Sequence, residues 1–384
     1  MNTRHENRIT YPILFGFFVM GFVDLVGIAT NYIKEDFALS DTSANLIPMM
    51  VFLWFALFSI PTGVLMGKIG KKQTVIMALV VTSVAMLIPI LSYSFMNLLF
   101  AFALLGIGNT ILQVSLNPML AGVVPAGKVA GTLTLGQFIK SISSFLGPIV
   151  AGAAATFWGN WKLTFVLYAA VSLLSTFWVY VVVPQDGRDE AQHAGFFSTL
   201  SLLADKKIGL LFLGILLIVG VDVGLNTALP HYLTVRADLP LSTAGLGSSL
   251  YFAFRTLGTF SGALLLVRTK PRSYLIVNMG IAVLAFLFLL FVQAPGGLFA
   301  AISILGFTCS SVFPILFSYA LQQKPDRSNE ISALMIMGVS GGALVTPVMG
   351  MVSDRLGVTA GLSLLLFCLL YLAALSMMLQ EKNK

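Results

Sequence analysis

Residues 11–33 read YPILFGFFVMGFVDLVGIATNYI, an apolar run interrupted near its middle by one carboxylate, Asp24. About 20 apolar residues are enough for an α-helix to cross the hydrocarbon core of a bilayer. A charged side chain at that depth costs roughly 2.5–3.5 kcal/mol, so such residues usually serve a function. The stretch therefore predicts a membrane-spanning helix with a functional acid at its centre.

The rest of the chain has the same character. Of its 384 residues, 58% are hydrophobic and only 10% are charged, which indicates an integral membrane protein. We expect the first helix to be retained and not cleaved as a signal peptide. Apolar stretches of spanning length predict an all-α fold of twelve transmembrane helices, over residues 11–33, 44–66, 73–92, 97–123, 130–157, 163–184, 207–233, 241–267, 273–294, 296–322, 329–352 and 358–380.

The sequence also repeats itself on either side of a polar linker. Asp24 in the first predicted helix recurs as Asp222 in the seventh, and Asn117–Pro118 in the fourth has a counterpart in Phe313–Pro314 of the tenth. Parallel six-helix repeats with a site at the midplane are typical of secondary transporters. The pattern predicts two pseudo-symmetric six-helix bundles, residues 1–184 and 207–384, and a cytoplasmic linker over residues 185–206.

The basic residues set the predicted orientation. The chain has 22 Lys and Arg, and of the 20 outside the predicted helix centres, 16 fall in the loops on one side. The loops of the other side hold only Lys34, Lys162, Arg236 and Arg355. Because basic residues accumulate in cytoplasmic loops, both termini are expected in the cytoplasm. The net charge of +7 is then a topology signal, and no nucleic-acid partner is expected.

Four charged side chains lie near the middle of predicted helices: Asp24, Lys140, Asp222 and Arg255. Two acids and two bases sum to zero charge, so Asp222 can pair with Arg255 and Asp24 with Lys140. Buried ion pairs that only fix packing are a poor source of stability, which favours a functional role. Asp24 and Asp222 are the candidate proton carriers, because a carboxylate beside a cation can exchange that partner for a proton.

Polar side chains accompany these charges at helical spacing. In the fourth helix, three amides recur every four residues and share one face. Groups that both donate and accept hydrogen bonds suit a polyhydroxylated ligand such as a sugar, although they also join helices in membranes. The candidate substrate-binding residues are Asn109, Gln113, Asn117, Gln137, Lys140, Asn226 and Arg255. Phe252, Tyr251, Tyr32 and Tyr232 are aromatic side chains that can stack on a sugar face.

The loop after the second helix reads GVLMGKIGKK and resembles the G-x-L-x-D-[RK]-x-G-[RK]-[RK] motif of the major facilitator transporters, with Gly67 in place of the usual Asp. GPIVAG at residues 147–152 resembles a glycine-proline signature of some members. The residues that carry the loop motif, with Leu65, are Gly63, Gly67, Lys68, Gly70, Lys71 and Lys72. The resemblance implies alternating access in which this loop changes its contacts.

LQVSLNPMLAGVVP, residues 112–125, resembles the fourth helix of the fucose permease branch of sugar:proton symporters. That branch implies a fucose, glucose or galactose type of substrate and protons as the coupling ion. The family acid thought to carry the proton corresponds to Gln113 here. A second family acid aligns near Gly27 or Ile28, one turn beyond Asp24, which is the candidate to replace it.

The sequence thus predicts a proton-coupled transporter of a sugar-like small molecule. We expect a monomer in contact with membrane lipid, without cofactor or metal, in the bacterial inner membrane. No catalytic or nucleotide-binding motif is found, so an enzyme or ATP-driven pump is not expected. Two alternatives stay open. Lys140 and Arg255 suit uptake of an acidic sugar or organic anion, and the 16 methionines suit an exporter of lipophilic drugs or lipids.

Overall fold

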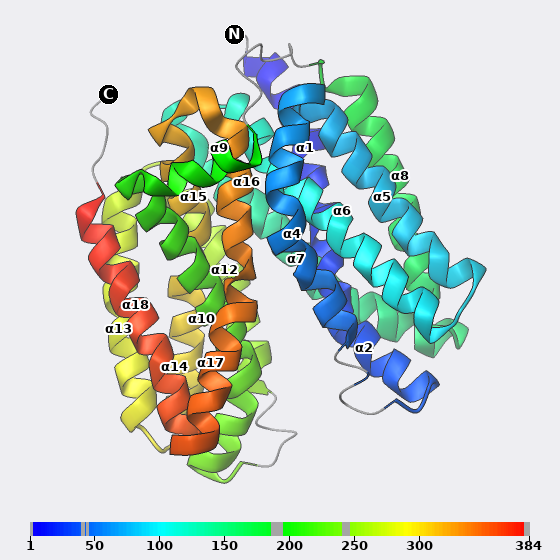
Figure 1. The fold of residues 1–384 in the computed structure, drawn as a ribbon. Coiled ribbons are helices and arrows are strands. Elements are labelled where there is room, and N and C mark those ends of the chain that lie inside the picture. Colours follow the sequence, from blue (N-terminus) through cyan, green and yellow to red (C-terminus); the bar gives the residue numbers. More distant parts are fainter. Residues whose placement is uncertain (1–2, 40–42, 44–45, 186–194, 240–245, 380–384) are drawn as a thin grey trace. The chain divides into compact units, whose positions relative to one another are not determined.

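In the computed structural model, which describes residues 3–39, 43, 46–185, 195–239 and 246–379, all regular elements of these ranges are helices (Figure 1). Eleven spans there are long and apolar enough to cross a membrane. The eighth expected helix, α12 (Leu246–Leu265), is not among them and carries Ser248, Arg255 and Thr259. With α12 added, the fold is the all-α architecture of twelve spanning helices that was predicted.

The helices follow the predicted order along the chain. Their bounds are α1 (Thr3–Met20), η1 (Gly21–Asp24), α2 (Leu25–Asp36), α4 (Leu46–Ile69), α5 (Lys71–Leu91), α6 (Phe95–Gly122), α7 (Val129–Trp158), α8 (Leu163–Val182), α9 (Phe196–Ser201), α10 (Lys206–Ala237), α13 (Pro271–Phe291), α14 (Pro295–Cys309), α15 (Val312–Gln323), α16 (Ser328–Met337), η5 (Gly338–Ser340), α17 (Gly341–Leu356) and α18 (Val358–Met378). Short 3₁₀ turns lie at 126–128, 202–204 and 325–327.

Three spans predicted as continuous helices are interrupted. The first is broken by η1, the tenth by a turn at Ser310 and Ser311, and the eleventh by η5. Two of the breaks coincide with very close packing. A Cβ added to Gly21 would lie 2.6 Å from the Lys140 carbonyl oxygen, and one added to Gly341 would lie 2.0 Å from that of Leu216. Apolar content predicted the length of each span but not these crossings, which only glycine permits.

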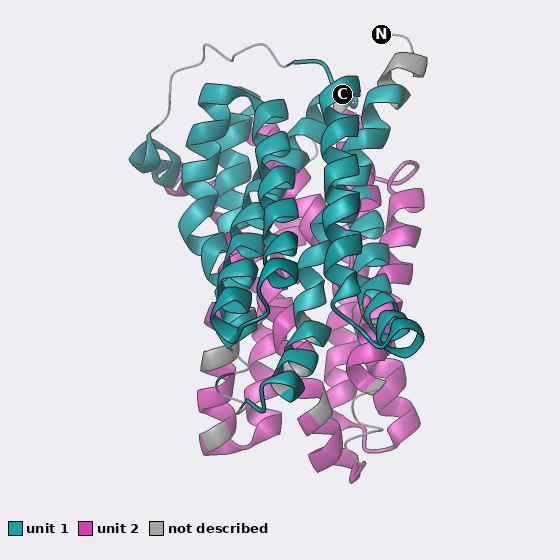
Figure 2. Ribbon diagram, turned by 90° about the vertical axis from the view of Figure 1, so that its right-hand side faces the viewer, with its two compact units in different colours: residues 1–126, 136–202, 324–337 teal, residues 127–135, 203–323, 338–384 magenta. Residues whose placement is uncertain are grey.

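The chain forms two compact units (Figure 2). Unit 1 contains residues 1–126, 136–202 and 324–337, and unit 2 contains residues 127–135, 203–323 and 338–384. In unit 1, α6 packs against α4 and α5, α8 packs against α5 and α1, and α16 packs against α4 and α6. In unit 2, α10 packs against α17 and α18, while α14 packs against α12 and α13. Each unit thus includes a short segment from beyond the predicted linker boundary.

A close helix crossing is repeated in the two units. A Cβ added to Gly106 of α6 would lie 2.3 Å from the carbonyl oxygen of Val51 in α4. The same distance separates a Cβ added to Gly306 of α14 from the carbonyl oxygen of Tyr251 in α12. Small residues let membrane helices approach until their backbones touch. The fourth and tenth helices therefore meet the second and eighth in the same way, as the sequence repeat suggests.

A second repeated feature is the capping of a helix C-terminus by a basic residue. Lys72, the last residue of the loop motif, donates from Nζ to the Tyr180 carbonyl oxygen at the end of α8, at 2.8 Å. Arg272 donates from Nη2 to the Met377 carbonyl oxygen at the end of α18, also at 2.8 Å. Carbonyl groups in the last turn of a helix lack intrahelical partners. A cation there also interacts favourably with the negative end of the helix dipole.

We expect Lys72→Met to lower the stability of the protein, because it removes the donor that caps α8. The loss should be about 0.5–1.5 kcal/mol, the usual range for one hydrogen bond with a helix-end charge effect. Thermal unfolding in detergent measures it. Lys71→Met is the matched control, since Lys71 is the neighbouring motif residue and we expect only a small change. Equal losses in the two variants would contradict the capping role.

The extracytoplasmic end of α2, by the predicted topology, is held by one carboxylate. Asp36 accepts a hydrogen bond from the Tyr93 hydroxyl and one from Trp161 Nε1 at 3.1 Å. The Lys162 ammonium lies 3.6 Å from the centre of the Tyr93 ring. Burial, followed by the hydrogen bond to Asp36, raises the pKa of Tyr93 and keeps its hydroxyl a donor. These contacts join the end of the first span to the turns after α5 and α7.

The predicted linker, residues 185–206, lies partly outside the described residues. Its described part contains α9, which is held by Arg327: the guanidinium donates to the Ser198 hydroxyl at 2.8 Å and the Ser198 carbonyl oxygen at 3.1 Å. Arg327 also pairs with Glu330 of α16. The linker therefore includes a short helix that packs beside α16 (Figure 1) and belongs to unit 1.

Candidate functional site

Asp222 forms the centre of a charged cluster in unit 2. Its side chain, in the middle of α10, is only 8% exposed, and its Oδ2 lies 2.6 Å from Nη2 of Arg255 in α12. Its other oxygen accepts a hydrogen bond from the Tyr251 hydroxyl. The predicted Asp222–Arg255 pair is thus confirmed. A carboxylate buried in this way needs its partners, because removing one member of a buried ion pair costs 3–5 kcal/mol as a rule.

The Arg255 side chain is less enclosed than that of Asp222. It is 28% exposed, so part of the Arg255 side chain is accessible from outside the cluster while Nη2 contacts the carboxylate. The cluster therefore combines a buried acid with a basic residue whose side chain is partly exposed.

Tyr251 is the residue of this cluster whose role the sequence reasoning missed. It was considered as an aromatic surface for a sugar, but its side chain is fully buried and its hydroxyl contacts Asp222. The spacing carried a signal, because Tyr251 precedes Arg255 by four residues and so shares its helix face. Gly306 brings α14 directly against the Tyr251 backbone. The end of α14 places the buried thiol of Cys309 near Asp222 and Arg255.

The second acid, Asp24, lies at the end of η1 in unit 1. It accepts a hydrogen bond from the Ser144 hydroxyl of α7. The close packing of Gly21 on the Lys140 carbonyl and on Ser143 brings the break in the first span against the polar face of α7. Lys140 lies one turn before Ser144, whose hydroxyl also donates to the Lys140 carbonyl oxygen at 3.0 Å. The structure thus brings Asp24 to the predicted face, and its pairing with the Lys140 ammonium stays a prediction.

The three amides of α6 form a buried ladder. Asn109 donates to the Met20 carbonyl oxygen at 2.7 Å, and Gln113 donates to Asn109 Oδ1 at 2.7 Å. Asn117 donates to the Gln113 carbonyl oxygen at 2.6 Å, and all three side chains are buried. Met20 is the last residue of α1, directly before the 3₁₀ turn η1. The predicted shared face is therefore used, at least in part, to stabilise the interruption beside Asp24.

The other predicted binding residues lie on two further helices. Gln137 is half-buried in α7, one turn before Ser141, whose hydroxyl donates to the Gln137 carbonyl oxygen at 2.9 Å. Asn226 is exposed on α10, one turn beyond Asp222, and its carbonyl oxygen accepts from Ser248 of α12 at 3.0 Å. Asn226 thus continues the Asp222 face in unit 2, and Gln137 continues the Lys140 face in unit 1.

The loop-motif residues lie around the turn from α4 to α5. Gly70 has φ +86°, a conformation that favours glycine, while Gly67 has open space around it. Lys68 lies in the last turn of α4, and Lys71 is the first residue of α5. Gly63 is in tight contact: an added Cβ would lie 2.4 Å from that of Ala333 in α16. Gly63 therefore lets α4 pack directly on α16.

A model of the Major Facilitator Superfamily matches residues 13–347. A glucose/galactose transporter of Brucella abortus is 26% identical, over 93% of this chain and 90% of that protein. A hexuronate transporter of Bacillus subtilis is 29% identical over 42% of this chain and 40% of its own length. The crystal structure of the E. coli fucose:proton symporter has a TM-score of 0.83 at 18% identity, covering 97% of this chain and 98% of that one.

Proposed function

Because the chain belongs to the Major Facilitator Superfamily, we propose that this multi-pass membrane transporter carries a small sugar or sugar derivative by proton-coupled alternating access. The observation that supports this most directly is the buried cluster of Asp222, Tyr251 and Arg255. The similarity to a glucose/galactose transporter over nearly the whole chain supports a sugar as the substrate.

Asp222 is the first candidate for the proton site. In the structure its charge is neutralised by Arg255, so a proton is bound only when the guanidinium takes another partner. A substrate that engages Arg255 would supply that partner. Binding of substrate and binding of a proton then favour each other, which is what symport requires. Asp24 is the second candidate, at the corresponding place in the first repeat and hydrogen-bonded to Ser144.

The sugar is proposed to contact the amides and cations already named. Asn226 and Arg255 are the members of the set that are exposed or partly exposed in unit 2, and Gln137 and Lys140 are partly exposed in unit 1. Asn109, Gln113 and Asn117 are buried. In our proposal the first group contacts the sugar directly, and the amide ladder becomes available when the break in the first span moves.

Contacts of α16 support alternating access. The Ser332 hydroxyl donates to the Val114 carbonyl oxygen of α6 at 2.6 Å, and Ala333 packs on Gly63. α16 follows the linker, whereas α4 and α6 precede it. When two six-helix repeats rock, contacts between segments from opposite sides of the linker must open and close. We propose that residues 1–184 and 207–384 are those repeats, with residues 185–206 as a cytoplasmic linker and both termini in the cytoplasm of a bacterium.

An acidic sugar is the second candidate substrate. The Arg255 side chain is partly exposed, and a guanidinium is suited to a carboxylate. The similarity to a hexuronate transporter covers about two fifths of this chain. An anion that replaces Asp222 as the partner of Arg255 would free the acid for a proton. Arg255, the protonated Asp222 and the bound anion would then together carry no net charge, as Arg255 and the ionised Asp222 do before the exchange.

A ligand panel tests the proposed substrate class. Neutral hexoses, deoxyhexoses, amino sugars, sugar acids and lipophilic drugs are added to the purified protein in thermal unfolding assays. We expect a neutral sugar to raise the unfolding temperature, because a ligand that binds only the folded state stabilises it by mass action. The shift should be lost in Asn226→Ala. Stabilisation by sugar acids alone favours the second candidate, and stabilisation only by lipophilic drugs contradicts sugar transport.

A further inference from the structure

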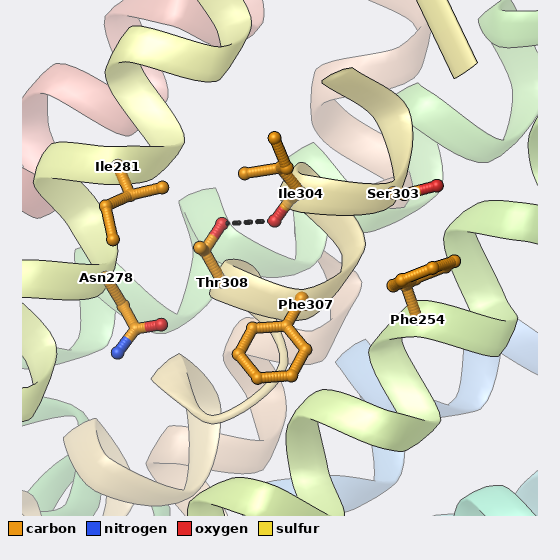
Figure 3. A pocket seen from close by; sticks show the side chains of 7 residues that line it. All are labelled: Phe254, Asn278, Ile281, Ser303, Ile304, Phe307 and Thr308. Atoms are coloured by element: carbon orange, nitrogen blue, oxygen red, sulfur yellow. Dashed lines mark hydrogen bonds between the residues drawn. The ribbon is translucent and has the colours of Figure 1, made fainter. Parts of the chain in front are cut away.

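A crevice in unit 2 lies on the side of α14 between α12 and α13. Its volume is about 250 Å³. Figure 3 shows the side chains around it: Phe254 of α12, Asn278 and Ile281 of α13, and Ser303, Ile304, Phe307 and Thr308 of α14. α14 packs against both neighbours, whereas α12 and α13 make at most marginal contact with each other. The crevice is therefore a gap between two helices with a third as its floor.

The corresponding helices of the first repeat pack differently. There α6 packs against α4 and α5, and α4 and α5 also pack against each other. The separation of α12 from α13 is thus a property of the second repeat. The crevice is therefore not a consequence of the helix arrangement that the two repeats share.

The lining of the crevice is apolar although three of its residues are polar. Ser303 donates to the Phe299 carbonyl oxygen, Thr308 to that of Ile304 (Figure 3), and Asn278 to that of Tyr274, each at 2.8 Å. Each of these donors is thus turned back to its own helix. A hydroxyl or amide donor used in this way is not offered to a ligand. With this mostly apolar lining, the crevice consequently suits a hydrocarbon better than a sugar.

The position of the crevice indicates where such a hydrocarbon comes from. Phe254, Asn278 and Ile281 lie near the middle of their spanning helices. Ile281 and Ile304 at the crevice are 43% and 42% exposed, and the apolar surface continues along α13 through Val277, Leu284 and Phe288. In a protein of this class, an exposed apolar surface at mid-span faces acyl chains.

We infer that this crevice is a binding site for one acyl chain of a membrane lipid, between α12 and α13. The chain would fill the space that direct packing of the two helices leaves, in contact with Phe254 and Phe307. Because α12 also carries Tyr251 and Arg255, the lipid would support the helix that holds the charged cluster. None of the lining residues is among the proposed substrate residues, and the inference does not depend on which substrate is carried.

Fluorescence quenching by lipids with brominated acyl chains tests the site. Phe254→Trp places a reporter at the crevice, and Leu284→Trp places a matched reporter on the exposed face of α13, which is 68% exposed at that residue. Each variant and the unsubstituted protein are placed in vesicles with a rising fraction of brominated lipid. The emission of the added tryptophan is the emission of the variant minus that of the unsubstituted protein. We expect the reporter at position 254 to lose emission at a lower brominated fraction than the one at 284.

A second variant identifies the crevice as the place of quenching. Ser303→Leu adds bulk to the floor and should suppress quenching at position 254 while leaving that at position 284 unchanged. If Phe254→Trp does not fold, Phe307→Trp serves as the reporter in the same comparison. Absent quenching at the crevice reporter, quenching no stronger than at 284, or quenching unaffected by Ser303→Leu would each overturn the inference.

Discussion

Asp222→Asn is expected to abolish accumulation of substrate against its gradient while exchange of substrate across the membrane continues. The amide keeps the shape of the carboxylate and can still accept from Tyr251, but it cannot bind and release the coupled proton. The ion pair with Arg255 is also lost, so the variant should unfold at a lower temperature. Uptake and exchange in proteoliposomes measure the two transport activities separately.

Two controls separate coupling from general damage. Asp222→Glu keeps an acid and should retain some accumulation. Asp205→Asn alters an acid at the start of the same helix, where Asp205 caps the backbone N–H groups of Lys207 and Ile208. Asparagine is an equally good cap, so this variant should behave like the unchanged protein. If Asp222→Asn and Asp24→Asn both accumulate substrate normally, neither acid is the proton site.

Gly306→Ala should be strongly destabilising although it adds only one methyl group. The new methyl group would lie 2.3 Å from the Tyr251 carbonyl oxygen, far inside van der Waals contact, so α14 has to move away from α12. Overpacking of this kind costs about 1–3 kcal/mol, and more where backbone is the obstacle. Because Tyr251 also contacts Asp222, transport should fall together with the unfolding temperature.

Gly280→Ala is the matched control for this prediction. Gly280 lies inside α13 with no atom near an added Cβ, so alanine there should be neutral or stabilising through its better helix propensity. Gly106→Ala repeats the test in unit 1, against Val51. If Gly306→Ala and Gly280→Ala unfold at the same temperature, the helices α12 and α14 are packed less closely than the structure indicates.

Much of the fold was predictable because a membrane restricts the possible structures. Apolar length identified the spans, and the charges identified Asp222 and Arg255 as a pair because consecutive helices carry them at similar depth. Apolar length cannot predict where a helix breaks. The interruptions at Gly21 and at Gly338–Ser340 depend on close contact with other helices, which no local pattern reveals.

The candidate site was predictable in part. The spacing of four residues correctly placed Asn109, Gln113 and Asn117 on one face, because an α-helix brings residues four positions apart to the same side. It could not identify the acceptor of Asn109, the Met20 carbonyl oxygen, which lies where the first span is interrupted. Tyr251 was missed for a similar reason, because its ring suggested stacking whereas its hydroxyl completes the carboxylate site.

Proton-driven accumulation is the most direct test of the account. Proteoliposomes receive an inward proton gradient and radiolabelled glucose, galactose or fucose, with and without a protonophore. One proton driven by 100 mV supplies about 2.3 kcal/mol, enough for roughly 50-fold accumulation of a neutral sugar. We predict uptake above equilibrium that the protonophore abolishes and that Asp222→Asn lacks. Uptake that stops at equilibrium and ignores the proton gradient would contradict proton-coupled sugar transport.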